Sequence, residues 1–172
     1  ITNYFKKDEF IIEIDDDLKK VVDNQRKDIL SFTDTFETII HKMNVEDVSY
    51  AGLYSVPNPM FMSGCDEYTT DLRYMLGILR IRRICKDIIL ETNYAEDFEN
   101  CILHYIRNGK LLKCNWLAGV TNNYSAGGCD GDGRSVDTEK KDKEHLAVKY
   151  PYHCKIFQRK NGRYDLRLKD RK

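Results

Sequence analysis

The hydrophobic positions of residues 1–50 predict one strand followed by one long helix. Residues 9–14 (EFIIEI) are typical of a short strand. The three aspartates after them suit the first turn of a helix, where carboxylates accept free backbone N–H groups. From residue 18 to residue 43, apolar residues recur at spacings of four and three, which predicts a single amphipathic helix that Asn44 ends. Such a stripe is most often core, and less often a partner-binding face or a coiled-coil seam.

The next segments predict a loop and a second helix. Residues 51–64 contain Pro57 and Pro59, which hold the backbone extended and prevent a helix from continuing. Residues 66–91 carry apolar side chains densely enough to predict a helix that is buried on more than one side. Three arginines interrupt this segment and form either a phosphate-contacting patch or a solvated stripe: Arg80, Arg82 and Arg83.

The segments from residue 96 to residue 144 predict a third helix, a strand and a long loop. Residues 96–107 place apolar side chains on one helical face, and Asn108-Gly109 is typical of a helix end. Residues 110–116 are predicted to form a strand. Residues 121–144 are polar and contain several glycines, which predicts a long loop, and loops of this length are functional or mobile.

The end of the chain predicts a β-hairpin and completes the fold class. Apolar and polar residues alternate in residues 147–158 and 164–168, on either side of Asn161-Gly162, the strongest short-range hairpin signal. The pattern predicts an α+β fold of three helices with a small antiparallel sheet ending in a C-terminal β-hairpin. We expect a single domain over residues 1–172, with the long polar loop at about residues 121–144.

The composition excludes an integral membrane protein and shows an uneven distribution of charge. Mean hydropathy is −0.59 and 33% of residues are charged, so we expect no membrane partner. Residues 1–100 contain 12 basic and 20 acidic side chains, whereas residues 101–172 contain 16 and 8. This asymmetry indicates a nucleic acid or another acidic partner, or else attraction between the two parts of the chain.

The six cysteines favour an intracellular protein with reduced thiols. They are widely separated and include no C-x-x-C pair, and a chain of 172 residues does not need disulfides for stability. We therefore expect a cytoplasmic or nuclear protein, although an even number of cysteines leaves open a secreted one with disulfides. The richness in Ile, Lys, Asn, Asp and Tyr is typical of an AT-rich genome, as in a virus or parasite.

The glycine-rich segment 127–133 contains one candidate nucleophile. Its aspartates do not follow the calcium-binding pattern, because glycine stands at the fourth position instead of the sixth. Cys129 has backbone amides of glycines beside it and four histidines elsewhere as candidate bases, so a cysteine-dependent hydrolase is one interpretation. The other interpretation is a flexible surface turn.

Several cysteines and histidines form motifs that resemble a known zinc domain. The motifs are an S-F pair, an A-G-hydrophobic-Tyr segment ahead of a cysteine, and a terminal series of E-H, aromatic-Pro, Cys and Gly: Ser31-Phe32, residues 51–54 ahead of Cys65, Glu144-His145, Tyr150-Pro151, Cys154 and Gly162. Their order resembles that of the BIR domain of the inhibitor-of-apoptosis family. The chain departs from this family at Tyr68, where a second cysteine is expected, and no spacing in it matches a compact zinc finger.

The BIR resemblance implies a zinc-stabilised domain that binds proteins. The implied zinc ligands are Cys65, His145 and Cys154, with a fourth from Cys101 or His104. A non-enzymatic protein-interaction module, which zinc would stabilise if the resemblance holds, is therefore the first functional hypothesis, with a protein as the partner and the oligomeric state open. The second hypothesis is nucleic-acid binding by the basic C-terminal hairpin, through Lys155, Arg159, Lys160, Arg163, Arg167 and Lys169. A cysteine-dependent hydrolase is the third.

Overall fold

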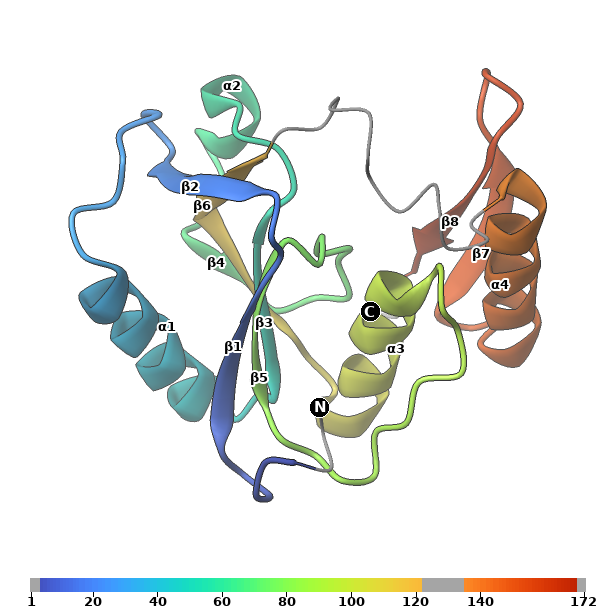
Figure 1. Cartoon of the computed structure of the whole chain (residues 1–172), viewed down its shortest axis with the longest axis horizontal. Helices are drawn as coiled ribbons and strands as arrows, with labels where there is room; N and C mark the ends of the chain where they lie inside the picture. Colours follow the sequence, from blue (N-terminus) through green and yellow to red (C-terminus); the bar gives the residue numbers. More distant parts are fainter. Residues whose placement is uncertain (1–3, 122–134, 170–172) are drawn as a thin grey trace.

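In the computed structural model, which describes residues 4–121 and 135–169, four helices surround two sheets with eight strands in all (Figure 1). The described elements are, in chain order, β1 (Phe10–Ile14), β2 (Leu18–Asp23), α1 (Phe32–Glu46), β3 (Tyr50–Tyr54), α2 (Pro59–Met62), β4 (Tyr68–Thr69), β5 (Leu79–Arg83), α3 (Glu96–Asn108), β6 (Leu112–Thr121), α4 (Val136–Lys149), β7 (Cys154–Gln158) and β8 (Tyr164–Leu168). Among these residues, none of the helices combines the length and the apolar character that crossing a bilayer requires.

The main sheet is mixed and curled. Its strand order is β1-β5-β3-β6-β2, and β4 pairs with β6 beside this path. The pairings are antiparallel except that between β3 and β6, which is parallel. Only residues 15–17 join β1 to β2, although these strands lie at opposite ends of the strand order. The sheet must therefore curl until its two outer strands meet at this corner.

Helices cover both faces of the main sheet. The buried side chains of α1, Phe36, Ile39 and Met43, pack on one face in a core that includes Leu53 and Ile81. α3 covers the other face, and α4 with the β7–β8 hairpin lies on the far side of α3 (Figure 1). The order of layers is therefore α1, main sheet, α3, and then the hairpin with α4.

The hairpin and α4 are joined to α3 by a separate core. Ile102 of α3, Leu146 of α4 and Cys154 and Leu166 of the hairpin are buried together. The hairpin strands pair in antiparallel register, with Gln158 opposite Tyr164. This C-terminal unit therefore shares α3 with the body of the protein, and the two parts can form opposite walls of a cleft.

The predicted fold of three helices with a small antiparallel sheet is wrong. The central sheet has six strands and is mixed, and four helices are present in the described residues. The helix predicted over residues 18–43 begins only at Phe32, where the Ser31 side chain accepts a hydrogen bond from Asp34 N at 3.2 Å. Residues 18–23 are β2 instead, because pairing with β6 and burial of Val21 and Val22 override the helical spacing.

Two central strands lie where a loop and a second helix were predicted. Residues 51–54 belong to β3, which is buried on both faces: Ala51 and Leu53 pack under α1, and Tyr50 packs beneath α3. Residues 79–83 form β5, between β1 and β3. β3 is covered on both sides and shows no alternation of apolar and polar residues, so its sequence looks like that of a short apolar loop.

The long polar loop predicted at residues 121–144 contains most of a helix. α4 begins at Val136 with a capping box in which Ser135 and Thr138 bond each other's backbone N–H groups. Residues 122–134, which include Cys129, lie outside the described residues. α4 is densely charged and only Leu146 in it is fully buried, so its sequence lacks the apolar stripe by which helices are found.

Three predicted elements are confirmed. The strand at residues 9–14 corresponds to β1, and the helix at residues 96–107 corresponds to α3, which Gly109 ends in a left-handed conformation. The hairpin turn forms at Asn161-Gly162, where Gly162 has φ 82°. These signals are local ones, set by capping and turn residues, and they do not depend on what covers the element.

Candidate binding cleft

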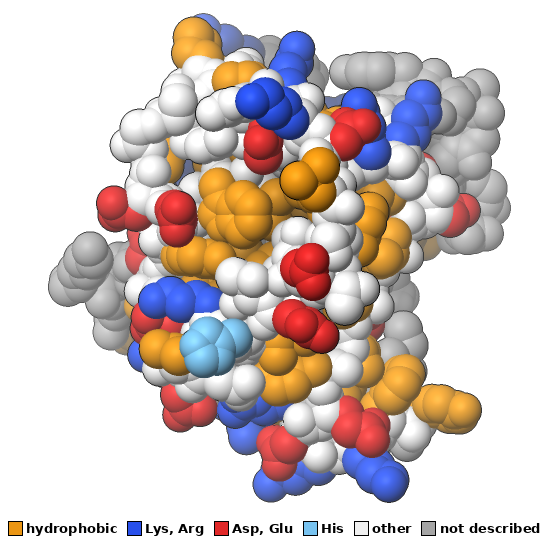
Figure 2. Space-filling model, turned by 90° about the vertical axis from the view of Figure 1, so that its left-hand side faces the viewer, with side chains coloured by type: hydrophobic (Ala, Val, Ile, Leu, Met, Phe, Trp, Pro, Cys, Tyr) orange, Lys and Arg blue, Asp and Glu red, His pale blue; other side chains and the backbone are white. Residues whose placement is uncertain are grey.

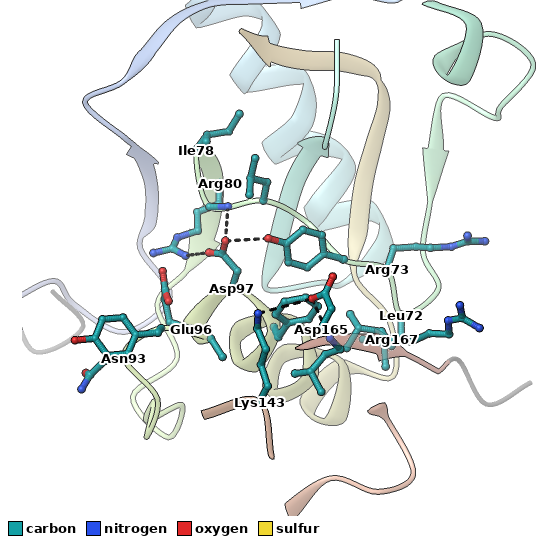
Figure 3. Close-up of a pocket in the computed structure, with 18 of the residues that line it drawn as sticks. Leu72, Arg73, Ile78, Arg80, Asn93, Glu96, Asp97, Lys143, Asp165 and Arg167 are labelled. Atoms are coloured by element: carbon teal, nitrogen blue, oxygen red, sulfur yellow. Dashed lines mark hydrogen bonds and ion pairs between the residues drawn. The ribbon is translucent and has the colours of Figure 1, made fainter. Parts of the chain in front are cut away.

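A cleft of about 1060 Å³ separates the body of the protein from the C-terminal hairpin (Figure 3). One wall, here called the sheet wall, consists of the end of β1, residues 72–80 and residues 93–98 at the start of α3. The opposite wall, here called the hairpin wall, consists of Lys143 of α4, Phe157 and Arg159 at the end of β7, and residues 165–168 of β8. Six separate segments of the chain therefore meet at this site.

A half-buried arginine, Arg80, organises the floor of the cleft. Arg80 Nε donates to Glu13 at 2.6 Å, and Arg80 Nη1 donates to Asp97 at 3.2 Å. Glu13 also accepts a hydrogen bond from Arg82 Nη2 at 2.6 Å. Burial alone would lower the pKa of Arg80, but the neighbouring Tyr50 and Glu13 raise it above its ordinary value, so the guanidinium stays charged. The sheet wall is thus built on a paired ionic network that is largely shielded from solvent.

Asp97 connects this network to the loop before β5. It lies in the first turn of α3, where the helix dipole favours negative charge. Its carboxylate accepts hydrogen bonds from Gly77 N at 3.0 Å and from the Tyr74 hydroxyl at 3.3 Å (Figure 3). A Cβ atom at Gly77 would collide with this carboxylate, so a larger residue there would displace Asp97 from its hydrogen bonds. The Tyr74 ring stacks on Phe98 with centroids 4.4 Å apart, which gives the sheet wall an aromatic surface beside its charges.

The hairpin wall carries its own charge cluster. Asp165 accepts hydrogen bonds from Arg159 Nε at 2.7 Å and from Leu166 N at 2.9 Å. Lys143 Nζ lies 4.0 Å from Asp165 and donates to a backbone carbonyl of β8 at 3.0 Å. Arg167 lies over the Phe157 ring at 5.3 Å. These contacts fix the side chains that face the sheet wall.

The two walls differ in the sign of their charge. Among the lining residues described, the sheet wall carries four acidic side chains and two arginines, a net charge of −2. The hairpin wall carries three basic side chains and one acid, a net charge of +2. The charged lining residues are Glu13, Asp15, Glu96, Asp97, Arg73 and Arg80 on the first wall and Lys143, Arg159, Arg167 and Asp165 on the second. The cleft therefore offers both signs of charge to a ligand.

A strap between β5 and α3 holds the hairpin wall in place. The Asp142 carboxylate on α4 accepts hydrogen bonds from two successive backbone amides, Asn93 N at 3.0 Å and Tyr94 N at 2.8 Å. Glu91 in the same strap pairs with Lys149 at the end of α4, at 2.6 Å. These contacts attach α4 to the start of α3, so the distance between the two walls is set without a ligand.

The five residues predicted to bind zinc do not gather into one site. Cys101 and His104 are buried in α3, and Cys154 is buried at the start of β7. Cys65 is exposed after α2, and His145 is exposed on α4, where it pairs with Glu91. Within the described residues, no group of three or more potential ligands could hold a metal ion. This arrangement does not fit a tetrahedral zinc site, and zinc stays a prediction from the sequence.

Two of the six basic residues predicted to contact nucleic acid line the cleft, namely Arg159 and Arg167. Lys155 stands opposite Arg167 in the hairpin register, so these two side chains share one face of the hairpin. The other three lie outside the cleft: Lys160 and Arg163 are exposed at the hairpin turn, and Lys169 donates to the Pro151 carbonyl at 2.9 Å. The hairpin therefore divides its basic residues between the cleft and the outer surface.

The described cysteines lack the properties of catalytic thiols. Burial raises the pKa of Cys101 to about 12 and of Cys154 to about 11, and it raises the pKa of Cys114 further. A thiol with such a pKa stays protonated and unreactive near neutral pH. No cysteine or histidine is found among the described residues that line the cleft. Cys129, the predicted nucleophile, lies outside the described residues.

Ser49 and His104 form a buried pair that does not resemble an activated serine. Ser49 Oγ lies 2.7 Å from His104 Nδ1 and donates its proton to Asn108 Oδ1. The serine oxygen must then accept from the imidazole, which is the reverse of general-base activation. Burial, followed by the charges of nearby arginines, lowers the pKa of His104 to about 3, so the ring stays neutral. The pair ties α3 to β3 and has a structural role.

The sequence patterns do not identify most residues of the cleft, because these residues are far apart in the chain. Glu13, Tyr74, Asp97 and Lys143 had no local motif to mark them. Arg80 was noticed, but it is neither a phosphate patch nor a solvated stripe, since its side chain is tied to carboxylates from two other segments. The signal that could have helped is the alternation Leu79-Arg80-Ile81, which is typical of a strand with one charged face.

Comparisons with known proteins give no relative: no family model, no curated protein and no solved structure matches the chain.

Proposed function

We propose that the chain is a non-enzymatic protein-interaction module, and that the cleft between the sheet wall and the hairpin wall receives a polypeptide segment of the partner. The observation that carries this proposal is the opposite net charge of the two walls. A polypeptide can present basic side chains to one wall and acidic side chains to the other, whereas a nucleic acid carries only negative charge along its backbone.

The aromatic side chains of the cleft support the same ligand class. Tyr74 and Phe98 form a stacked pair on the sheet wall, and Phe157 lies under Arg167 on the hairpin wall. Aromatic and arginine side chains are enriched in protein interfaces, and aromatic rings bury a large area at a small loss of side-chain entropy. Charge would fix the direction of the bound segment, and these rings would supply contact area.

Thiol chemistry has little support among the described residues. The described cysteines are buried with raised pKa values or, like Cys65, lie outside the cleft. Among the described residues, the hydrogen-bonded pair Ser49–His104 is buried, and the serine donates its proton to Asn108 and not to the histidine. Binding is therefore the function that the geometry of the cleft supports best.

Selection of peptides from a random library displayed on phage tests this proposal. We expect the selected peptides to carry both basic and acidic residues, and to bind Arg167→Glu at least tenfold more weakly in calorimetry. Arg163→Glu is the matched control: it makes the same charge change in the same hairpin, at an exposed position outside the cleft lining. Its affinity should stay within about twofold of the original.

Two results would overturn the proposal. If the two substitutions weaken binding equally, the peptides respond to overall charge and not to the cleft. If the selected peptides are uniformly acidic and ignore Asp15→Lys, then the sheet wall takes no part in recognition.

Nucleic-acid binding is a second candidate because of one specific observation on the hairpin. Lys155 and Arg167 stand side by side on one face, and the aromatic ring of Phe157 lies beneath Arg167. Basic side chains next to an aromatic ring suit a single strand, which offers phosphates and stacking bases. The acidic sheet wall would repel the phosphates, so we rank nucleic acid below a polypeptide as the ligand.

Fluorescence anisotropy with a 20-nucleotide oligothymidine would decide between the candidates. Binding through three phosphate contacts should weaken by about tenfold or more between 50 and 200 mM salt. The substitution Lys155→Glu should weaken it further. Absence of binding at 50 mM salt would remove nucleic acid from consideration and leave the protein ligand in place.

A further inference from the structure

The outer edge of β1 is open to another strand. β1 stands at one end of the main sheet and pairs with β5 on its inner side. Within the described residues, no other strand pairs with its outer side. The other outer strand, β2, is different, because Ile29 N donates to the Val21 carbonyl and Asp23 N donates to the Lys27 carbonyl. The segment that follows β2 thus covers the edge of β2, whereas no described segment pairs in this way with the outer edge of β1.

The hydrogen bonds at the two ends of β1 show which residues face outward. Asp15 N donates to the Ile78 carbonyl at 3.0 Å, and Ile84 N donates to the Glu9 carbonyl at 2.8 Å. Both bonds follow the antiparallel register of β1 and β5, in which Glu13 lies opposite Arg80. In such a pair the residues that bond inward alternate with those that face outward. The odd-numbered residues of β1 therefore direct their N–H and C=O groups toward β5.

The even-numbered residues direct theirs away from the sheet: Phe10, Ile12 and Ile14. Ile12 and Ile14 are also exposed at the side chain, by 39% and 54%. Figure 2 shows the face that carries α1, with apolar side chains gathered at its centre and acidic side chains around them. Leu30 and Phe32 at the start of α1 are exposed apolar residues as well. A strand at this edge would find both backbone partners and an apolar surface.

The charge at one end of β1 indicates which side chains a strand bound at this edge would carry. Asp15, Asp16 and Asp17 follow β1 directly, and none of them forms an ion pair within the described residues. Burial raises the pKa of Asp15, and repulsion from Asp17 and Asp16 adds to this effect despite a hydrogen bond from the Asp16 amide. A positively charged group at this corner would relieve the repulsion.

We propose that the outer edge of β1 accepts a β-strand from a partner protein, with apolar residues at alternate positions and Lys or Arg at the end that meets Asp15, Asp16 and Asp17. Main-chain hydrogen bonds to Phe10, Ile12 and Ile14 supply affinity, and the basic end sets direction and register. Ile14 and Asp15 also line the cleft, whereas Phe10 and Ile12 lie outside its lining, so protection at Phe10 and Ile12 distinguishes this edge from the cleft.

A second copy of the chain fits this edge poorly. Two β1 strands paired antiparallel over their full length would have Ile12 opposite Ile12. That register places Glu9 opposite Asp15 at both ends, so like charges would meet there. A foreign strand with a basic end is therefore the favoured occupant.

The test uses a synthetic peptide, Lys-Lys-Thr-Ile-Thr-Val-Thr, and amide hydrogen exchange followed by NMR. Bound antiparallel, its basic N-terminus meets Asp15, Asp16 and Asp17. We expect at least tenfold slower exchange at the amides of Phe10, Ile12 and Ile14 when the peptide is present. The inward amides are already hydrogen-bonded and should change little. A peptide with Glu in place of both lysines should bind at least tenfold more weakly.

Two variants at one position separate strand pairing from other contacts. Ile12→Pro removes an outward N–H group that the sheet does not use, and proline is tolerated on edge strands, so the fold should persist. Ile12→Pro should weaken peptide binding at least tenfold. Ile12→Thr keeps the N–H group, so its affinity for the peptide should stay within about twofold of that of the original chain. If Ile12→Pro fails to fold, a probe peptide with N-methylated backbone amides replaces it and should not bind the unaltered protein.

The proposal is overturned if both variants bind equally, if protection appears at the cleft instead of β1, or if the N-methylated peptide binds as well. Protection of the same amides without peptide, together with a dimer in sedimentation, would assign the edge to a second copy and overturn the foreign strand. Arg167→Glu should leave peptide binding at β1 unchanged, so failure of the cleft proposal can be recognised separately.

Discussion

The stability of the fold should fall between pH 7 and pH 5 because of His104. In the folded chain the pKa of this buried side chain is lowered from 6.5 to about 3. As the pH falls below 6.5, a proton binds His104 in the unfolded chain but not in the folded one, so unfolding is favoured. The stabilisation is complete above pH 6.5 and is lost progressively toward pH 3. At 1.36 kcal/mol per pH unit, the loss at pH 5 is about 2 kcal/mol.

Urea unfolding at pH 7 and pH 5 measures this effect. The variant His104→Gln cannot titrate, so its change in the free energy of unfolding between these pH values should be smaller by about 2 kcal/mol. His41→Gln, at an exposed position on α1, is the matched control and should behave like the original chain. Equal pH dependence in His104→Gln and the original would refute the reasoning, as would an NMR titration in which His104 is protonated above pH 5.

Three other predictions concern the described contacts. Arg80→Met leaves the shielded Asp97 carboxylate without its cation and leaves Glu13 with Arg82 alone, and it should lower the free energy of unfolding by about 3 kcal/mol in urea. Arg163→Met, at an exposed position, should change it by nearly zero. Ser135→Ala removes the N-cap of α4 and should cost about 1 kcal/mol by the same measurement; no change would contradict the capping box. In a Cys129→Ser background, only Cys65 should react rapidly with iodoacetamide, and a second rapid addition in mass spectrometry would contradict the burial of the other thiols.

Local signals in the sequence were sufficient for part of the fold. The Asn161-Gly162 turn and the Gly109 helix end were predictable, because each depends on a backbone conformation that few residues adopt. β3 was not predictable, because it lies inside the sheet and Tyr50 and Ala51 on successive positions are both buried. β5 did carry a signal, the alternation Leu79-Arg80-Ile81, but the apolar residues around it favoured a helix. An apolar segment becomes a buried strand only if other strands pair with it. Those strands lie elsewhere in the chain, so the segment's own sequence does not distinguish a buried strand from a helix.

The residues of the cleft were harder to predict from the sequence than the helices and strands were. Arg80 and Glu13 are 67 residues apart in the chain, and Arg80 and Asp97 are 17 apart. Only the tertiary fold brings these charges together, and their burial is a property of the assembled layers. The basic hairpin was recognised from composition, yet the acidic wall opposite Arg159 and Arg167 changes the ligand class that this basic charge suits.

Mapping of a selected peptide by NMR tests the proposal of a protein-binding cleft most directly. The largest amide shifts on peptide addition should fall on both walls together. They are expected at Gly77 and Asp97 on the sheet wall and at Leu166 and Arg167 on the hairpin wall. Shifts confined to the outer surface of the hairpin around Arg163, with the sheet wall unchanged, would contradict it.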